Sequence, residues 1–358
     1  MRLDKSLFLN YLAISCTLLI AGCSTPKIEV IEAIFYPPAP AQPRLQYLTS
    51  YSLPANFTPP RSAFKTFLLG EQNDKSPGIA KPYGIEVNGS ELYVCDTMTA
   101  NIHVLNFAER TWEYFSPKFS SSLKKPINIA IDTNGVRYVA DPIRGDVPIY
   151  NATGKFIDAI NLPENMKPVG VAVSDDRIAI ADLNNHTVHL LDKETRALLF
   201  SIPQNPENKQ EQLFSPTNVT FDQQGNIFIS DTGSCRVQKY APDGTYLQSI
   251  GSMGTSPGQF VRNKGLAVDR NNFLYVVDAA TQLVQIFNEE GLLLLAFGQP
   301  GASPYPLSLP ADVVIDYENI SLFQPYASND FELEYLIFVS SQYGPRKISV
   351  YGFGHSKK

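Results

Sequence analysis

Leu274-Tyr275-Val276-Val277-Asp278 decides the fold of this chain, because closely similar stretches occur four more times. Each is an apolar run that ends in aspartate, and a β-branched residue follows that aspartate by six positions. The aspartates stand 45, 41, 49 and 47 positions apart. A short apolar run bounded by turn residues predicts a β-strand. The other copies are residues 92–96, 137–141, 178–182 and 227–231.

Each copy belongs to a longer unit with four expected strands. An apolar strand that begins with Pro-x-Gly or a variant precedes the run, as at Pro82-Tyr83-Gly84. A turn such as Asp243-Gly244 and a short strand at residues 246–250 close the unit. Four short strands per unit, at a period in the forties, are typical of β-propeller blades. The recurrent aspartates are expected to bond to the turn that follows them.

A sixth unit is altered. Its inner strand begins at Pro310, an insertion occupies residues 317–335, and the chain ends without a fourth strand. Residues 45–51 resemble an outermost strand and are expected to complete this blade, which closes the ring and removes an exposed sheet edge. The sequence therefore predicts an all-β, six-bladed β-propeller over residues 45–354, followed by a polar tail at 355–358.

The N-terminus is typical of an exported lipoprotein. Arg2 and Lys5 precede an apolar stretch at residues 7–20, which is too short for a membrane span and reads as a secretory signal. Residues 19–23, Leu-Ile-Ala-Gly-Cys, resemble a bacterial lipobox. We expect removal of residues 1–22 and acylation of Cys23, including palmitate, because several acyl chains anchor stably where one is marginal. An ordinary signal with an incidental cysteine is the alternative.

The residues that follow indicate the membrane and a linker. Ser24 stands where many inner-membrane lipoproteins carry aspartate, and by that resemblance the outer membrane is favoured; the membrane face stays open. Residues 23–44 contain Pro26, Pro37, Pro38, Pro40 and Pro43. Such a segment prefers polyproline II and is expected to act as a semi-rigid stalk.

Composition excludes several functions. The 358 residues carry a formal charge of −6 and no basic stripe, which argues against nucleic-acid binding. The four cysteines form no Cys-x-x-Cys pair, so zinc-finger, iron–sulfur and haem-attachment motifs are absent from the sequence. We expect no cofactor and no haem bound by this chain. Cys95 occupies a column of small residues and is expected to be a buried structural thiol.

The repeated unit resembles the NHL repeat, whose pattern is roughly Pro-x-Gly-aliphatic-Ala-Val-Asp, an aromatic-Val-Ala-Asp strand, a polar turn and Arg-Val-Gln. Residues 264–269 and 231–238 follow it well. The match covers five blades clearly and the sixth loosely. The whole layout resembles six-bladed NHL lipoproteins of bacterial envelopes. Some of those are encoded near multihaem cytochromes, so by analogy alone cytochromes are expected neighbours.

Histidines give little support for channel chemistry. NHL-type propellers include amidating lyases that hold zinc through histidines lining the channel. Here His103 and His189 occupy a third-strand position away from the channel, His186 lies in a turn and His355 in the tail. We therefore expect no metal site and assign no catalytic residue.

One column of the inner strands alternates between glycine and a polar residue. Blades two, four and six carry Asn128, Asn218 and Asp312 there, which predicts three polar side chains around the channel with approximate threefold spacing. Two interpretations are open. These residues cap strand entries or adopt a left-handed backbone, as glycine does. Alternatively, they bind a cation weakly or hold a small polar ligand.

Two classes of function follow. The first is a non-enzymatic, membrane-anchored scaffold that binds another envelope protein, and this is the function that the sequence favours. Aromatic residues of the insertion are expected partner contacts, although they could instead plug the side or base of the ring. The second is a metal-dependent hydrolase or lyase acting in the central channel. The aromatic residues are Phe323, Tyr326, Phe331 and Tyr335.

Overall fold

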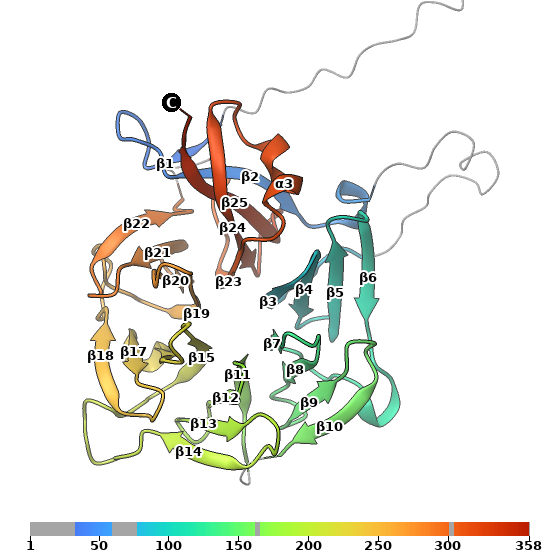
Figure 1. Ribbon diagram of the computed structural model, residues 1–358, viewed down its shortest axis with the longest axis vertical. Coiled ribbons are helices and arrows are strands. Elements are labelled where there is room, and N and C mark those ends of the chain that lie inside the picture. Colours follow the sequence, from blue (N-terminus) through green and yellow to red (C-terminus); the bar gives the residue numbers. More distant parts are fainter. Residues whose placement is uncertain (1–32, 59–76, 162–164, 301–303, 358) are drawn as a thin grey trace, which may run out of the picture. The chain divides into compact units, whose positions relative to one another are not determined.

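The computed structural model describes residues 33–58, 77–161, 165–300 and 304–357. Six antiparallel sheets stand radially around a central axis and form a six-bladed β-propeller (Figure 1). Within these ranges, no helix combines the length and the apolar character needed to cross a membrane. The predicted signal at residues 1–22 and the predicted lipid site Cys23 lie outside the described residues.

Each of the first five blades consists of four strands in chain order, from the channel outward. Blade 1 is β3 (Pro82–Asn88), β4 (Glu91–Asp96), β5 (Asn101–Asn106) and β6 (Thr111–Phe115). Blade 2 is β7 (Asn128–Ile131), β8 (Arg137–Ala140), β9 (Val147–Tyr150) and β10 (Phe156–Ile160). Blade 3 is β11 (Pro168–Val173), β12 (Arg177–Asp182), β13 (Thr187–Asp192) and β14 (Leu198–Ile202). Blade 4 is β15 (Pro216–Phe221), β16 (Ile227–Asp231), β17 (Arg236–Tyr240) and β18 (Tyr246–Ile250). Blade 5 is β19 (Asn263–Val268), β20 (Leu274–Asp278), β21 (Leu283–Phe287) and β22 (Leu293–Phe297).

Blade 6 combines segments from the two ends of the described chain. Its strand order from the outside is β1 (Phe35–Tyr36), β2 (Leu45–Tyr51), β25 (Ile348–Ser356), β24 (Phe331–Ser341) and β23 (Pro310–Asp316). The element boundaries differ from the expected ones at two places. β1 lies inside the expected linker, because Tyr36 packs on the rings of Phe297 and Tyr351, and β25 continues into the expected tail.

Each sheet is packed between two neighbours, so its inner strands are buried on both faces. All five residues of β20 are buried, which explains why the second strands read as continuous apolar runs instead of alternating ones. The core lies between the blades. One apolar cluster, for example, joins Ala179 and Val188 of blade 3 to Val219 and Ile229 of blade 4.

A buried aspartate ends the second strand of each of the first five blades, or directly follows it in blade 2, and we call these five residues the latch aspartates. All are 0% exposed: Asp96, Asp141, Asp182, Asp231 and Asp278. Asp278 accepts hydrogen bonds from the backbone N–H of Val261 (2.9 Å) and Arg262 (3.0 Å), just before the inner strand. It also accepts one from Ala280 in the following turn (3.0 Å), which confirms the expected turn bond.

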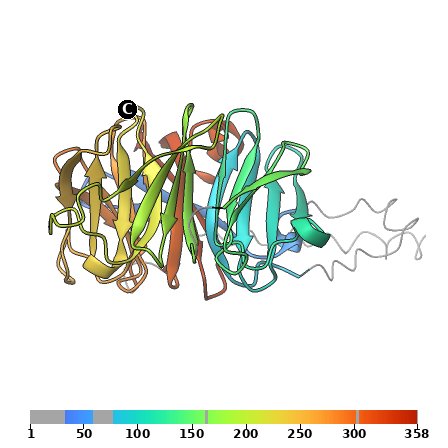
Figure 2. The same ribbon diagram turned by 90° about the horizontal axis from the view of Figure 1, so that it is seen from below.

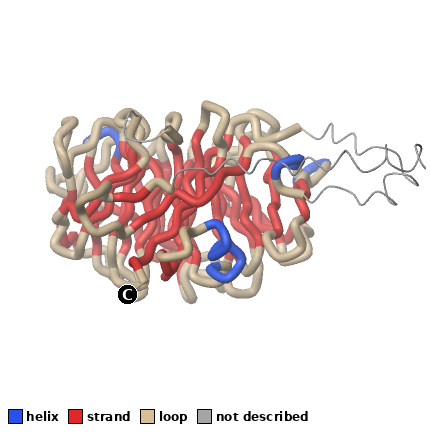
Figure 3. The backbone as a smooth tube through the Cα atoms, turned by 90° about the horizontal axis from the view of Figure 1, so that it is seen from above, coloured by secondary structure: helices blue, strands red, loops and turns tan. Residues whose placement is uncertain are grey.

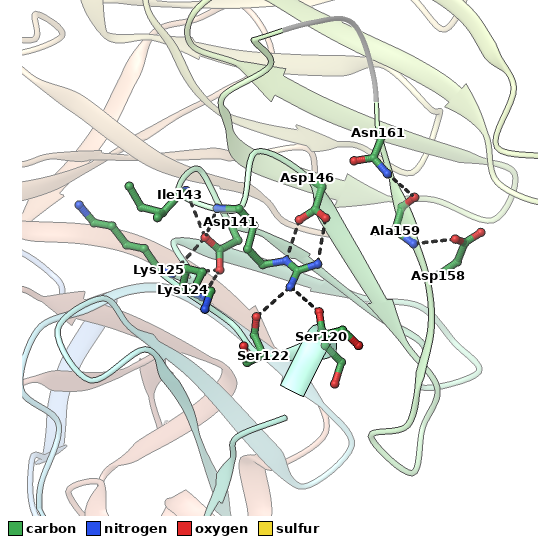
Figure 4. A network of polar contacts seen from close by, with 12 residues as sticks. Ser120, Ser122, Lys124, Lys125, Asp141, Ile143, Asp146, Asp158, Ala159 and Asn161 are labelled. Atoms are coloured by element: carbon green, nitrogen blue, oxygen red, sulfur yellow. Dashed lines mark hydrogen bonds and ion pairs between the residues drawn. The ribbon is translucent and has the colours of Figure 1, made fainter. Parts of the chain in front are cut away.

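Figure 4 shows the same arrangement in blade 2. Asp141 accepts from the backbone N–H of Lys124 (2.6 Å), Lys125 (3.0 Å) and Ile143 (3.2 Å). Close by, the Arg144 guanidinium pairs with Asp146 and donates to two carbonyl oxygens of the loop that arrives from blade 1. The connection between two blades is therefore held by charge-assisted bonds.

Two latch aspartates also contact histidines. His103 Nε2 lies 3.3 Å from Asp96 Oδ2, and His189 Nε2 lies 3.4 Å from Asp182 Oδ2. Both histidines stand on third strands, at the expected positions. Burial alone would raise the pKa of Asp182, but hydrogen bonds from His189 and the backbone outweigh burial and lower it to about 2. The histidines therefore hold the latch carboxylates in their charged form.

The latch predicts a specific loss of stability for Asp278→Asn. The new amide group would face the Val261 N–H, so one buried donor would lose its acceptor, and the free energy of unfolding should fall by about 1–3 kcal/mol. Urea denaturation measures this change. The matched control is Asp175→Asn in an exposed turn, which should change stability by less than about 0.5 kcal/mol. Equal stability of the two variants would contradict the latch role.

Candidate functional site

The inner strands of every blade except blade 2 carry a β-bulge near their first residues. The pairing register shifts between Pro216 and Asn218 in blade 4 and between Pro310 and Asp312 in blade 6. A bulge re-aims the side chain that follows it. As a result, polar residues at the third position of these strands point into the channel, where they line a common cavity with Asn128 of blade 2.

Asn128, Asn218 and Asp312 meet across the channel, and we call them the polar plug. Asn218 Nδ2 donates to Asp312 Oδ1 (3.2 Å), and Asn128 Nδ2 donates to Asp312 Oδ2 (3.4 Å). The backbone N–H of Ile85 in blade 1 also donates to Oδ2 (3.1 Å). The structure thus brings all three predicted channel residues together, and their side chains are buried.

Steric contact explains why glycine alternates with the plug residues. A Cβ atom on Gly265 would lie 2.0 Å from Asp312 Oδ1, and one on Gly84 would lie 2.6 Å from the Asn128 Cα. Each plug residue therefore needs a glycine in the preceding blade.

The left-handed interpretation is wrong, because no plug residue has a positive φ. All three accept a backbone N–H near a strand entry, as the capping interpretation expects; Asp312 Oδ1 accepts from the Val313 N–H (3.0 Å). Asn218 Oδ1 accepts from the Val219 N–H (2.7 Å), and Asn128 Oδ1 accepts from the Val171 N–H of blade 3 (2.9 Å).

A cavity of about 220 Å³ extends from the plug along the inner strands. The residues two positions after each glycine or plug residue also line this cavity. They are small or uncharged in every blade except blade 1, which carries Glu86. Burial, and then the nearby Asp312, raise the pKa of Glu86 to about 8. Burial also raises the pKa of Asp312 to about 7, against the effect of its hydrogen bonds.

The sequence analysis missed Glu86. Alignment of the six inner strands could have revealed it, because the equivalent residues of the other blades carry no charge and Glu86 is the only carboxylate at this position. They are Ala130, Ala172, Thr220, Ala267 and Val314.

The two faces of the ring differ in charge. Because successive strands are antiparallel, connections alternate between two faces, as the side views show (Figures 2 and 3). We call the face that bears the second-to-third-strand turns and the blade-to-blade loops the basic face. Its loops present lysine or arginine just before four inner strands, although one loop also carries Glu207 and Glu211. The basic residues are Lys81, Lys124, Lys125, Lys167 and Arg262.

These loops also expose apolar side chains, at separate positions around the ring. Met253 is 73% exposed, Met98 69%, Ile143 65%, Phe214 56% and Tyr343 54%. On the opposite face, which we call the acidic face, exposed carboxylates accompany fewer exposed bases such as Lys155 and Arg270. These carboxylates are Asp175, Asp176, Glu194, Asp243, Glu289, Glu290 and Glu318.

The aromatic insertion is mostly buried, which corrects the expectation that its four rings contact a partner. Phe323, Phe331 and Tyr335 are 2%, 1% and 2% exposed, whereas Tyr326 is 39% exposed. β24 begins at Phe331 within the insertion and alternates buried with exposed residues. This period of two directs Phe331 and Tyr335 inward, and Tyr335 exchanges a hydrogen bond with Tyr275 (2.6 Å).

Other candidate groups lie apart from the channel cavity. Cys95 and Cys235 are free, buried thiols, which confirms the expectation for Cys95. His103 and His189 contact latch aspartates instead of the channel. Over the part of the chain that the structure describes, no group of three or more His, Cys, Asp or Glu side chains is arranged to hold a metal ion.

Comparison with known families supports the assignment of the repeat. Residues 165–189, which span β11, β12 and the start of β13, match the family model described as NHL repeat. The protein is a six-bladed β-propeller that carries an NHL repeat. No curated protein sequence matches the chain.

Solved structures resemble the propeller in fold. A streptogramin B lyase is 12% identical, with a TM-score of 0.53 and coverage of 87% of this chain and 88% of its own. A Bacteroides thetaiotaomicron protein of unknown function is 15% identical, with a TM-score of 0.58 and coverage of 87% and 76%. A catalytically inactive virginiamycin B lyase from Staphylococcus aureus, with quinupristin, is 12% identical, with a TM-score of 0.53 and coverage of 77% and 96%. At these identities the likeness concerns the fold alone.

The raised pKa of Glu86 predicts a pH-dependent effect of Glu86→Gln. Folded Glu86 keeps its proton up to about pH 8, whereas the unfolded side chain loses it near about pH 4. The wild type therefore loses stability between these values, and the variant does not. Urea denaturation should show equal stability at pH 4 and a more stable variant at pH 9. Exposed Glu113→Gln is the control, and a Glu86→Gln effect that is the same at both pH values would contradict the prediction.

Proposed function

We propose that this protein is a non-enzymatic scaffold that is anchored to the bacterial outer membrane and binds another envelope protein through its basic face. The exposed apolar side chains of that face, such as Met98, Ile143 and Tyr343, carry the proposal. Exposed apolar groups that gather on one surface mark interaction sites. The surrounding lysines favour a partner whose contact surface is acidic, and opposite charges speed association and select the partner.

The proposed anchor is lipid on Cys23, supported by the lipobox and by Ser24. Ala33, where the described chain begins, lies ten positions after Cys23. A chain of that length spans at most about 35 Å. The linker is effectively shorter than the sequence suggests, because Phe35–Tyr36 pairs with β2. The scaffold would thus work close to the membrane, within reach of other envelope proteins, with cytochromes as expected neighbours by analogy.

A second candidate function is a hydrolase or lyase that acts in the channel. One observation favours it: Glu86 and Asp312 share a cavity, and both have pKa values raised to the range in which carboxyls transfer protons near neutral pH. We place channel chemistry second because Asp312 already serves structural contacts, and Glu86 faces aliphatic walls.

Replacement of the lipid-bearing cysteine tests the anchor. Cys23→Ser should move the protein from the membrane fraction to the soluble fraction and abolish palmitate labelling, because the acyl chains supply the affinity for the bilayer. Fractionation and immunoblotting measure the change. Cys95→Ser is the matched control, since its thiol is buried in the propeller. Retention of Cys23→Ser in the membrane would contradict the anchor.

A pull-down tests the scaffold. Tagged protein from mildly solubilised, cross-linked envelopes should recover one envelope protein in stoichiometric amount. The variant Met98→Ser/Ile143→Ser/Tyr343→Ser should recover at least tenfold less, because it removes apolar contacts and leaves the core unchanged. Mass spectrometry identifies the partner, and haem absorbance of the eluate reports whether it is a cytochrome.

The control removes three exposed apolar groups elsewhere. Leu198, Leu247 and Leu294 lie on outer strands and are 49%, 48% and 50% exposed. Their replacement by serine should leave recovery unchanged. Equal recovery by both triple variants, or an eluate that contains only the propeller, would argue against the scaffold and in favour of channel chemistry.

A further inference from the structure

The cavity beside the polar plug leads toward the acidic face. Its lining runs from the plug to the last residues of three inner strands, Val173, Phe221 and Val268. The same three residues also line a hollow of about 530 Å³ on the acidic face, together with the exposed Asp175 and Asp176. Shared walls therefore connect the cavity with the acidic face of the ring.

The rim at this end of the channel is acidic. In blades 1 to 5, the turns between the first and second strands carry a single basic residue, Arg270, and five aspartates. Arg177 of β12 pairs with one of these aspartates, and Lys193 and Lys239, which lie further from the axis, contact two others. Lys264, the second residue of β19, stands beyond the plug toward the basic face. Since a cleft lined by one sign of charge focuses its field, a cation is drawn in from the acidic face. The aspartates are Asp132, Asp175, Asp176, Asp222 and Asp269.

Glu86 is the carboxylate of the cavity that is available to a cation. Asp312, the other titratable group of the lining, already accepts four hydrogen bonds on its two oxygens. Glu86 takes part in none of the ion pairs of the described residues, and among those residues only the backbone N–H of Val87 favours its charged form. A cationic ligand would supply the missing counter-ion.

The walls of the cavity indicate the kind of cation. Each innermost strand pairs on one side only, so its other edge presents backbone C=O groups to the channel. An ammonium has three N–H donors, which Glu86 and such carbonyl oxygens can accept. The walls around Glu86 are largely aliphatic, with Ala130, Ala172 and Val314 at the equivalent positions, and the cavity of about 220 Å³ has room for an alkyl chain. No group of three or more His, Cys, Asp or Glu side chains in the described ranges is placed to hold a metal ion.

We propose that the channel binds a primary alkylammonium ion, with its nitrogen on the Glu86 carboxylate and its alkyl chain along the aliphatic walls. The ligand enters from the acidic face, and the polar plug prevents it from passing through the ring. The proposal concerns binding and includes no reaction. It does not depend on the scaffold role proposed above, which rests on the opposite face.

Binding of this kind must depend on pH, because the ammonium needs a charged Glu86. Burial, and then Asp312, raise the pKa of Glu86 to about 8, and burial raises that of Asp312 to about 7. An alkylamine stays protonated up to about pH 10, as lysine does. Binding should therefore become about tenfold tighter between pH 7 and pH 9, and at pH 7 it should release a proton.

Calorimetry of the detergent-solubilised full chain tests the site with butylammonium chloride at pH 7 and pH 9. We expect saturable binding that is tighter at pH 9. Tetramethylammonium has the same charge but no N–H donor, so it should bind at least tenfold more weakly. The proposal is overturned by an absence of saturable butylammonium binding at pH 9, by equal binding of tetramethylammonium, or by displacement of butylammonium by an equal concentration of Ca²⁺.

Variants connect binding to Glu86. Glu86→Gln keeps the shape of the side chain and removes its charge, so it should weaken butylammonium binding at least tenfold and abolish the pH effect. Glu113→Gln, at an exposed position of β6, is the matched control and should bind like the wild type. Unchanged binding in Glu86→Gln would overturn the proposal. Urea denaturation checks that both variants are folded, and the pH dependence is measured in the wild type, so the test also holds without the variants.

Discussion

The hydrogen bonds of the latch aspartates determine how one blade joins the next. Each of the five carboxylates is fully buried and accepts backbone N–H groups from the loop that enters its own blade. Without this acceptor, the N–H groups would be buried and unpaired, which is costly. Because these donors lie just before the inner strand, the latch also sets the level at which that strand begins.

The channel depends on this alignment. Inner strands aligned at one level bring Asn128, Asn218 and Asp312 to one height, where they meet and the glycines of the preceding blades make room for them. The plug then divides the channel. A cavity with Glu86 lies along the inner strands beyond it, and Lys264 stands at the mouth on the basic face.

Function is best understood from this division. The basic face combines cationic side chains with exposed apolar ones, a composition suited to a protein surface of opposite charge. The lyases of similar fold share only 12% identity with this chain, so their activity is a property of those proteins and is not transferred to this one.

The sequence by itself determined the number of blades, their strands, the latch aspartates and the inner-strand positions of the plug residues. A blade is an antiparallel meander of consecutive strands, so its pattern of apolar and turn residues can be read from a short stretch of chain. Only the tertiary structure decided that the plug residues bond to one another, that Phe323, Phe331 and Tyr335 face inward, and that Glu86 shares a cavity with Asp312. The physical reason is distance along the chain. These outcomes depend on contacts such as that between Ile85 and Asp312, 227 positions apart, which no local pattern encodes.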